Sequence, residues 1–335
     1  MEAFEPNEPR KRRWRWRQYS LSTLLVVVTI VAVGLGLVTS RAERQRRAVA
    51  AIREAGGYVW YDFERGQPGS KTPPPGPDWL RPILGVDYFA DVVGASASRM
   101  TDATCSHFSA LPKLENLSLG NTQVTDAGLA HLAGLTSLKE LDLRGTRVTG
   151  TGLGHLTGLT RLQALFLDGT PVTDAGLADL GELTSLQRLG LSGRQVTDAG
   201  LAHLAGLTSL RELNLNNTQI TDAGLAQLTE STSLGWLALN NTQITDAGLA
   251  HLAAMKSLWR LDLNDPQITD AGLAHLGRST TLEVLQLHGP QITDAGLAHL
   301  ARLTSLQSLR LRGTQVTDGG CDRLRQALPG CSVGH

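Results

Sequence analysis

The chain has 335 residues, of which 41% are hydrophobic, so it is long enough to bury a large core. Its 31 Lys and Arg balance its 31 Asp and Glu overall, but residues 1–47 carry ten basic and four acidic residues, and the remainder carries 21 and 27. This mildly acidic main body argues against nucleic acid as a partner, because phosphate binding requires a basic surface.

The amino terminus has the pattern of a membrane anchor. Residues 1–18 form a basic tail, and no charged side chain occurs in the 23 residues 18–40. As a helix this stretch reaches about 34 Å, enough for a hydrocarbon core of roughly 30 Å. We therefore predict a transmembrane signal-anchor helix over residues 19–40 that contacts the lipid bilayer. A cleaved signal peptide and a buried core helix are the alternatives, and the length and basic flanks favour the anchor.

Basic residues flank the predicted span unequally. Six cations precede it and four follow it. By the positive-inside rule, this difference predicts a cytoplasmic N terminus and an exported C-terminal domain. The cations ahead of the span are Arg10, Lys11, Arg12, Arg13, Arg15 and Arg17, and those behind it are Arg41, Arg44, Arg46 and Arg47.

Two short regions separate the predicted span from the rest of the chain. Residues 41–64 have helix propensity followed by strand propensity, and we expect this juxtamembrane element to pack on the next domain. Residues 65–86 are rich in Pro and Gly, which predicts a linker. Residues 87–335 are predicted to form a repeat domain with a cap at each end.

A period of 24 residues governs this domain. Leu114, Leu117 and Leu119 recur at the same spacing in nine consecutive copies, and all 27 positions are leucine. The glycine of the following Thr-Asp-Ala-Gly-Leu segment is constant from Gly128 to Gly320. A fixed period of this length predicts stacked copies of one unit, each of which buries its apolar side against its neighbours.

Each copy predicts one strand and one helix. In residues 138–161, Leu141 and Leu143 alternate with polar residues, the pattern of a strand with one buried face. The Thr-Asp pair that follows in most copies can accept hydrogen bonds from free amides at a helix start. Leucines at every third position of residues 200–207 suit a helix of about two turns. This order requires a parallel sheet with right-handed crossovers.

Both ends of the array have signs of caps. Residues 100–105 align with residues 124–129 one period later, so the segment from about Asp87 reads as a degenerate first repeat. Residues 324–333 predict one more helix turn and a last short strand.

The cysteines have two interpretations. Cys105 and Cys321 stand where other copies have leucine, which favours small buried apolar side chains. A Cys321–Cys331 bridge that closes the C-terminal cap is the alternative, and it requires an exported domain.

The repeated unit, Leu-x-x-Leu-x-Leu-x-x-Thr-x-Val/Ile, resembles the leucine-rich repeat. Its Thr-Asp-Ala-Gly-Leu segment is similar to the ribonuclease-inhibitor-like and cysteine-containing branch, which also occurs behind F-box segments. With its predicted anchor, the chain resembles bacterial membrane-anchored leucine-rich-repeat proteins. The resemblance covers about two-thirds of the chain. It implies an α/β right-handed solenoid, with a curved parallel sheet on the concave face and short helices on the convex face, behind an N-terminal transmembrane helix.

One column departs from the family pattern. The family has Asn or Cys where this chain has threonine, and a threonine hydroxyl can still bond the neighbouring backbone. The column consists of Thr122, Thr146, Thr170, Thr218, Thr242 and Thr314, with Arg194, Pro266 and Pro290 in the other copies.

Two columns of polar side chains have the residue types of metal sites. The histidine column also contains Asp179, Gln227 and Arg323, so a copied consensus explains it better than a metal site does. A role at the helix starts explains the aspartate column better than calcium does. Because no nucleophile, phosphate-binding loop or zinc-spaced set stands out, we expect no enzyme, no cofactor and no metal. The histidines are His131, His155, His203, His251, His275 and His299, and the aspartates are Asp126, Asp174, Asp198, Asp222, Asp246, Asp270, Asp294 and Asp318.

Ligand-binding residues are expected on the concave face, where the strand positions between the leucines vary from copy to copy. Phe166 and Trp236 are large aromatics on this open face. Arg188, Glu212 and Arg260 flank them. Aromatic and arginine anchors with a polar rim are enriched in protein interfaces, so we predict that these five residues bind protein. The alternative is scattered surface side chains without a role.

The sequence thus favours a membrane-anchored, non-catalytic scaffold that binds a protein or peptide ligand. A structural or self-associating element of the cell envelope is the alternative. The F-box relatives suggest a third role, a substrate receptor of a ubiquitin ligase. Nothing ahead of the repeats resembles an F-box, and a predicted span occupies that place.

Overall fold

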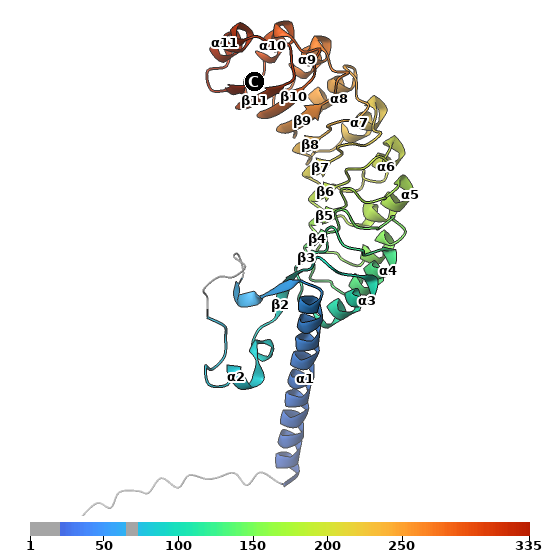
Figure 1. The fold of residues 1–335 in the computed structure, drawn as a ribbon, viewed down its shortest axis with the longest axis vertical. Helices are drawn as coiled ribbons and strands as arrows, with labels where there is room; N and C mark the ends of the chain where they lie inside the picture. The colour runs from blue at the N-terminus through green and yellow to red at the C-terminus, as the bar shows by residue number, and fades with distance from the viewer. Residues whose placement is uncertain (1–20, 65–72) are drawn as a thin grey trace, which may run out of the picture.

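Twelve strands stand side by side in chain order in one sheet of the computed structural model, which describes residues 21–64 and 73–335. Figure 1 shows the strands along the inner side of a curved array and short helices along its outer side. The predicted solenoid is therefore confirmed. The strands are β1 (Tyr58–Tyr61), β2 (Val92–Ser96), β3 (Asn116–Ser118), β4 (Glu140–Asp142), β5 (Ala164–Phe166), β6 (Arg188–Gly190), β7 (Glu212–Asn214), β8 (Trp236–Ala238), β9 (Arg260–Asn264), β10 (Val284–His288), β11 (Ser308–Arg312) and β12 (Ser332–Gly334).

The strands from β2 to β12 are parallel and pair residues one period apart. Leu141 of β4 lies between Leu117 of β3 and Leu165 of β5. β1 is the exception, because it pairs antiparallel with β2. Parallel neighbours require a crossover, and the α-helix or 3-10 turn of each repeat supplies it on the same side of the sheet.

The repeated leucines fill the space between the strands and the helices. All 27 are buried, and none exposes more than 4% of its surface. They belong to one continuous core cluster from Ala48 to Val333. Burial of one leucine side chain stabilises the fold by about 1.5–3 kcal/mol, so repeats that cover each other's leucines depend on one another.

The helices of the repeats are shorter at the N-terminal end of the array than at the other end. The predicted two turns match the seven residues of α7 to α10, but α4 to α6 have only four or five. Gly134, Gly158 and Gly206 stand where the copies with longer helices have Glu, Ala or Arg, and glycine disfavours helix. The short α5 is the exception, because its copy has Glu182 at this position. The helices are α3 (Asp102–Cys105), α4 (Asp126–Leu129), α5 (Asp174–Leu177), α6 (Asp198–Ala202), α7 (Asp222–Leu228), α8 (Gly248–Ala254), α9 (Asp270–Leu276), α10 (Asp294–Leu300) and α11 (Asp318–Ala327), with 3-10 turns η3 (Ser106–Ala110), η4 (Ala130–Leu132), η5 (Leu153–Leu156) and η6 (Ala178–Glu182).

The threonine column closes the turn after each strand. In five copies the threonine is buried, and its Oγ1 donates a hydrogen bond of 2.5–3.0 Å to the carbonyl of the leucine three residues earlier. The expected bond to neighbouring backbone is therefore confirmed. The five are Thr122, Thr146, Thr170, Thr218 and Thr242.

The Thr-Asp pairs connect each repeat to the next. Thr221 caps α7 as expected, because its Oγ1 accepts a hydrogen bond from the backbone N of Ala223 at 3.3 Å. Asp198 instead accepts the backbone N and the Oγ1 of Thr221 in the following repeat, at 2.9 and 2.6 Å. The expectation for the aspartates is thus corrected: seven of the eight bond the start of the helical segment in the next repeat, whereas Asp318, in the last repeat, pairs with His335. We call this contact the Asp–Thr clamp, and it recurs at Asp102, Asp126, Asp174, Asp222, Asp246, Asp270 and Asp294.

The clamp explains the constant glycine. A Cβ on Gly224 would lie 2.2 Å from Oδ1 of Asp198, so a larger residue would displace the carboxylate. One copy lacks the clamp, because Gly150 replaces the aspartate and adopts a φ of +115°. Thr173, in the next repeat, starts α5 without a side-chain cap bond.

Helix α1 (Leu21–Glu54) is continuous and has two environments. Its large apolar side chains between Leu24 and Val38 are 51–66% exposed, whereas Ala48, Val49 and Ile52 join the core cluster. Among the described residues it is the one helix long and apolar enough to cross a membrane, and its most apolar stretch is not buried. The alternative of a buried core helix therefore does not match the structure. The predicted basic tail, residues 1–18, lies outside the described residues.

The residues that follow α1 extend the sheet by one strand. β1 pairs with β2 of the first repeat, and Gln45 Nε2 donates to the Ala90 carbonyl at 2.8 Å. Tyr61 Oη donates to Asp87 Oδ1 at 3.1 Å. This element thus packs on the repeat domain, as expected. Three short turns complete it: η1 (Asp62–Glu64), α2 (Arg81–Leu84), which lies within the predicted linker, and η2 (Val86–Tyr88).

The C-terminal cap contains the expected last strand, β12, after α11. Cys105, Cys321 and Cys331 are all buried and free, so the Cys321–Cys331 bridge is not formed. Burial raises the pKa of Cys105 to about 12, which keeps this thiol protonated and unreactive.

We expect Gly224→Ala to destabilise the array by about 1–3 kcal/mol, because the added Cβ separates Asp198 from Thr221. Denaturation of the full-length chain in detergent, followed by circular dichroism, measures the change. Gly134→Ala is the matched control, since nothing lies within 4 Å of its added Cβ. Equal costs for the two substitutions would contradict the clamp.

The clamps also predict a pH dependence. Partial burial raises the pKa of Asp126, but hydrogen bonds from Thr149 and Thr151 outweigh it, so this pKa lies below its usual value. A carboxylate with a lower pKa when folded stabilises the fold above its unfolded pKa of about 3.9, and that contribution is lost as the pH falls through the folded pKa. Asp126→Asn should therefore lower the melting temperature at about pH 7 and make little difference at about pH 3. A difference that stays constant over this range argues against the assignment.

Candidate functional site

Three rows of side chains cross the concave face, because strand residues two apart point to the same side. On β7 and the residues that follow it, Glu212 belongs to the first row, Asn214 to the second and Asn216 to the third. The strand register carries each row from repeat to repeat.

Four of the five predicted site residues are neighbours in the first row. Arg188, Glu212, Trp236 and Arg260 stand in direct register on β6 to β9. Phe166 lies in the second row on β5, opposite Gly190 of β6. The structure thus brings the five residues onto five adjoining strands.

Phe166 is held between two guanidinium groups. The Cζ atoms of Arg144 and Arg188 lie 5.4 and 5.5 Å from its ring centroid. Arg188 forms an ion pair of 2.9 Å with Glu140, and Arg144 forms one of 2.7 Å with Asp142. Partial burial raises the pKa of Asp142, but the hydrogen bonds from Arg144 outweigh it, so this carboxylate stays ionised. We call these five residues the Phe166 cluster.

Trp236 has a similar arrangement. The guanidinium of Arg260 lies 4.8 Å from its ring centroid, and its Nε1 donates to Asp262 Oδ2 at 2.8 Å. Asp262 also pairs with Arg260 at 3.1 Å and is only 7% exposed. We call these three residues the Trp236 cluster. Its bonds hold the indole in one orientation on the concave face.

Glu212 lies between the two clusters. It stands next to Arg188 and Trp236 in the first row, but its carboxylate forms no hydrogen bond or ion pair within the described residues. It therefore offers a carboxylate beside Trp236, two strands away from Phe166.

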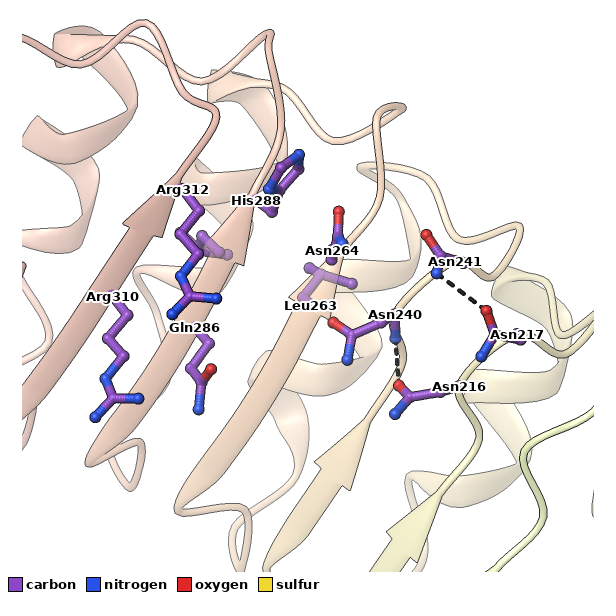
Figure 2. A pocket seen from close by; sticks show the side chains of 11 residues that line it. Asn216, Asn217, Asn240, Asn241, Leu263, Asn264, Gln286, His288, Arg310 and Arg312 are labelled. Atoms are coloured by element: carbon purple, nitrogen blue, oxygen red, sulfur yellow. Dashed lines mark hydrogen bonds between the residues drawn. The ribbon is translucent and has the colours of Figure 1, made fainter. Parts of the chain in front are cut away.

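A hollow of about 390 Å³ lies further along the concave face, toward the C-terminal cap. Figure 2 shows its lining, which comes from β9 to β11 and from the residues after β7 and β8. The lining is mostly side-chain amides and cations, so we call it the amide hollow. It comprises Asn216, Asn217, Asn240, Asn241, Leu263, Asn264, Gln286, Leu287, His288, Arg310 and Arg312.

Asparagine ladders shape one side of the amide hollow. Asn216 Oδ1 accepts the backbone N of Asn240 at 2.7 Å, and Asn217 Oδ1 accepts Nδ2 of Asn241 at 3.0 Å (Figure 2). Asn217 and Asn241 adopt φ values of +58° and +57°, a conformation that asparagine tolerates better than most residues. The same turn therefore supplies both the backbone geometry and the polar lining.

The sequence interpretation missed this hollow and the acidic partners of the aromatic anchors. The available signal was the pair Arg310 and Arg312, which puts two cations on one face of the last full repeat. Both are exposed, and neither has an ion-pair partner in the part of the chain that the structure describes.

The histidine column lies on the outer helices, as expected. Three of its members, His251, His275 and His299, occur in α8, α9 and α10. Within residues 21–64 and 73–335, no three His, Cys, Asp or Glu side chains converge as a metal site.

Several solved structures are similar to this chain. Internalin C2 of Listeria monocytogenes is 30% identical, with 64% of this chain and 84% of that chain covered and a TM-score of 0.49. A second internalin of that organism (inlF) is 21% identical, with coverages of 76% and 92% and a TM-score of 0.37. A leucine-rich-repeat protein of Leptospira interrogans is 17% identical, with coverages of 68% and 74% and a TM-score of 0.43.

Three family models match parts of the repeat array. A leucine rich repeat model matches residues 112–172, a model of two leucine rich repeat copies matches residues 184–227, and a further leucine rich repeat model matches residues 302–324. No curated protein matches the sequence. All three matched segments lie in the part of the chain that has the 24-residue repeat and the parallel strands.

Proposed function

Because the chain belongs to the leucine-rich-repeat family, we propose that it is a membrane-anchored, non-catalytic scaffold that binds a protein or peptide on its concave face. A leucine-rich-repeat domain fits a protein-binding scaffold in general. The observation that carries the finer proposal is that Phe166 and Trp236 are both held by guanidinium groups on this face.

The two clusters have the properties of interface anchors. Aromatic and arginine side chains account for most binding energy in protein interfaces, especially where they are rigid before the partner arrives. Phe166 and Trp236 are each partly exposed, so a partner can bury the remaining ring surface. The Arg260–Asp262 pair already holds the indole, so little side-chain freedom is lost on binding.

The exposed half of α1 supports the membrane anchor. The large apolar side chains from Leu24 to Val38 are more than half exposed, and leaving them in water is unfavourable. A lipid bilayer covers such a surface without a protein partner. Figure 1 shows α1 extending away from the array, so its exposed half is separate from the concave face.

We expect Trp236→Ala to weaken the complex with a captured protein partner by about 1–3 kcal/mol, because it removes a rigid anchor. Crosslinked partners of the native chain are identified first, and the affinity of each is then measured with the variant. Trp259→Ala is the matched control, since this exposed tryptophan directly precedes β9 and packs over Gly235, outside both clusters.

The double variant Phe166→Ala, Trp236→Ala tests the site as a whole. Capture that survives in this variant at native affinity means that the ligand binds elsewhere. Self-association of the purified full-length chain, with no other partner captured, favours the structural alternative.

We expect a reporter fused to the C terminus to be exported, because more cations precede the span than follow it. One reporter is active only outside the cytoplasm and the other fluoresces only inside it. Replacing Arg10, Lys11, Arg12 and Arg13 by Gln removes the difference and should reduce the exported fraction. A fluorescent cytoplasmic fusion of the native chain would overturn the proposed orientation.

A further inference from the structure

We propose that the amide hollow binds an acidic, extended segment of the protein partner, whose carboxylates pair with Arg310 and Arg312. This proposal rests on the proposed function and specifies the chemistry of the partner at a second part of the concave face.

The charges of the concave face are uneven. Arg144, Arg188 and Arg260 each pair with a carboxylate of this chain. Arg310 and Arg312 are exposed and have no such partner among the described residues. They lie two residues apart on β11, so their side chains leave the same face at a separation of about 7 Å. Two unpaired guanidinium groups at this spacing suit two carboxylates of one ligand.

The other side of the hollow suits a peptide backbone. The side-chain amides of Asn240, Asn264 and Gln286 have no hydrogen-bond partner among the described residues. Each amide offers a donor and an acceptor, as a peptide group does, and can therefore pair with an extended chain. The amides and the arginines together favour an acidic peptide.

Other polyanions fit this face less well. No Phe, Tyr or Trp side chain lines the hollow for a sugar ring or a base to stack on, and the one ring in its lining, His288, lies over Gly313. On the rest of the concave face five carboxylates outnumber the three arginines, so a polyanion that follows the whole face would be repelled there. The carboxylates are Glu140, Asp142, Asp168, Glu212 and Asp262. A protein segment needs no ring to stack on, and its acidic part can be short enough to contact the hollow alone.

The hollow and the Trp236 cluster share strand β9, which carries Arg260 and Asp262 of the cluster and Leu263 and Asn264 of the lining. Trp236 lies on β8 and Arg310 on β11, three strand spacings or about 14 Å apart across the sheet. An extended segment of four or five residues covers this distance. One partner can thus contact the aromatic anchor and the arginines together.

The test uses the full-length chain in detergent and two fluorescent probes, a deca-glutamate and a deca-glutamine peptide. We expect the deca-glutamate peptide to bind more tightly, and its affinity to fall as salt is raised. Arg310→Gln with Arg312→Gln should weaken its binding about tenfold. The matched control is Arg278→Gln with Arg302→Gln, which removes two exposed, unpaired arginines from outside the concave face and should leave binding unchanged.

Three results would overturn the proposal. The first is equal weakening by the two double variants, which indicates a general charge effect. The second is deca-glutamate binding that does not change in the Arg310 and Arg312 variant. The third is binding of polygalacturonate without binding of deca-glutamate, which indicates an acidic polysaccharide as the ligand.

Failure here is distinguishable from failure of the proposed function. If the captured partner is lost with the Phe166 and Trp236 variant but not with the Arg310 and Arg312 variant, the scaffold function stands and the acidic segment does not. If the deca-glutamate result holds while the partner ignores Phe166 and Trp236, the aromatic site is wrong. Unchanged melting temperatures verify that each variant is folded.

Discussion

The structure depends on the burial of leucine between repeats. No copy of the 24-residue unit can cover its own apolar side, and each leucine loses contact with water only when the next copy stacks on it. Stacking places the strands about 4.8 Å apart, whereas the helical side needs more room, so the sheet lies on the inside of the curve. The concave face is a consequence of this packing.

Polar contacts then set how the copies stack. Each Asp–Thr clamp joins one helix start to the next, and the glycine beside it leaves room for the carboxylate. The leucines supply most of the burial, while the clamp adds a polar bond between the helix starts of neighbouring repeats. Where Gly150 replaces the aspartate, the repeat keeps its leucines and its place in the sheet but has only the 3-10 turn η5. The clamp thus refines a stack that apolar burial already holds.

The candidate site uses the positions that the core leaves free. Strand residues between the leucines point away from the core, so their identity costs little stability and can serve binding. In the middle of the array these positions pair aromatic rings with guanidinium groups and carboxylates. Toward the C-terminal cap they carry amides and unpaired arginines. One surface of the domain therefore carries an aromatic region and a cationic region on adjoining strands.

The sequence by itself determined the repeat, the parallel sheet, the caps and the face on which Phe166 and Trp236 lie, because period and alternation decide which side chains are buried. Only the tertiary structure decided the contacts between copies. Arg188 reaches Glu140 across 48 residues, and Asp198 bonds Thr221 rather than its own helix. The amide hollow likewise combines side chains from several strands and turns. Such contacts depend on the rotation between neighbouring repeats and on side-chain rotamers, and a periodic sequence specifies neither.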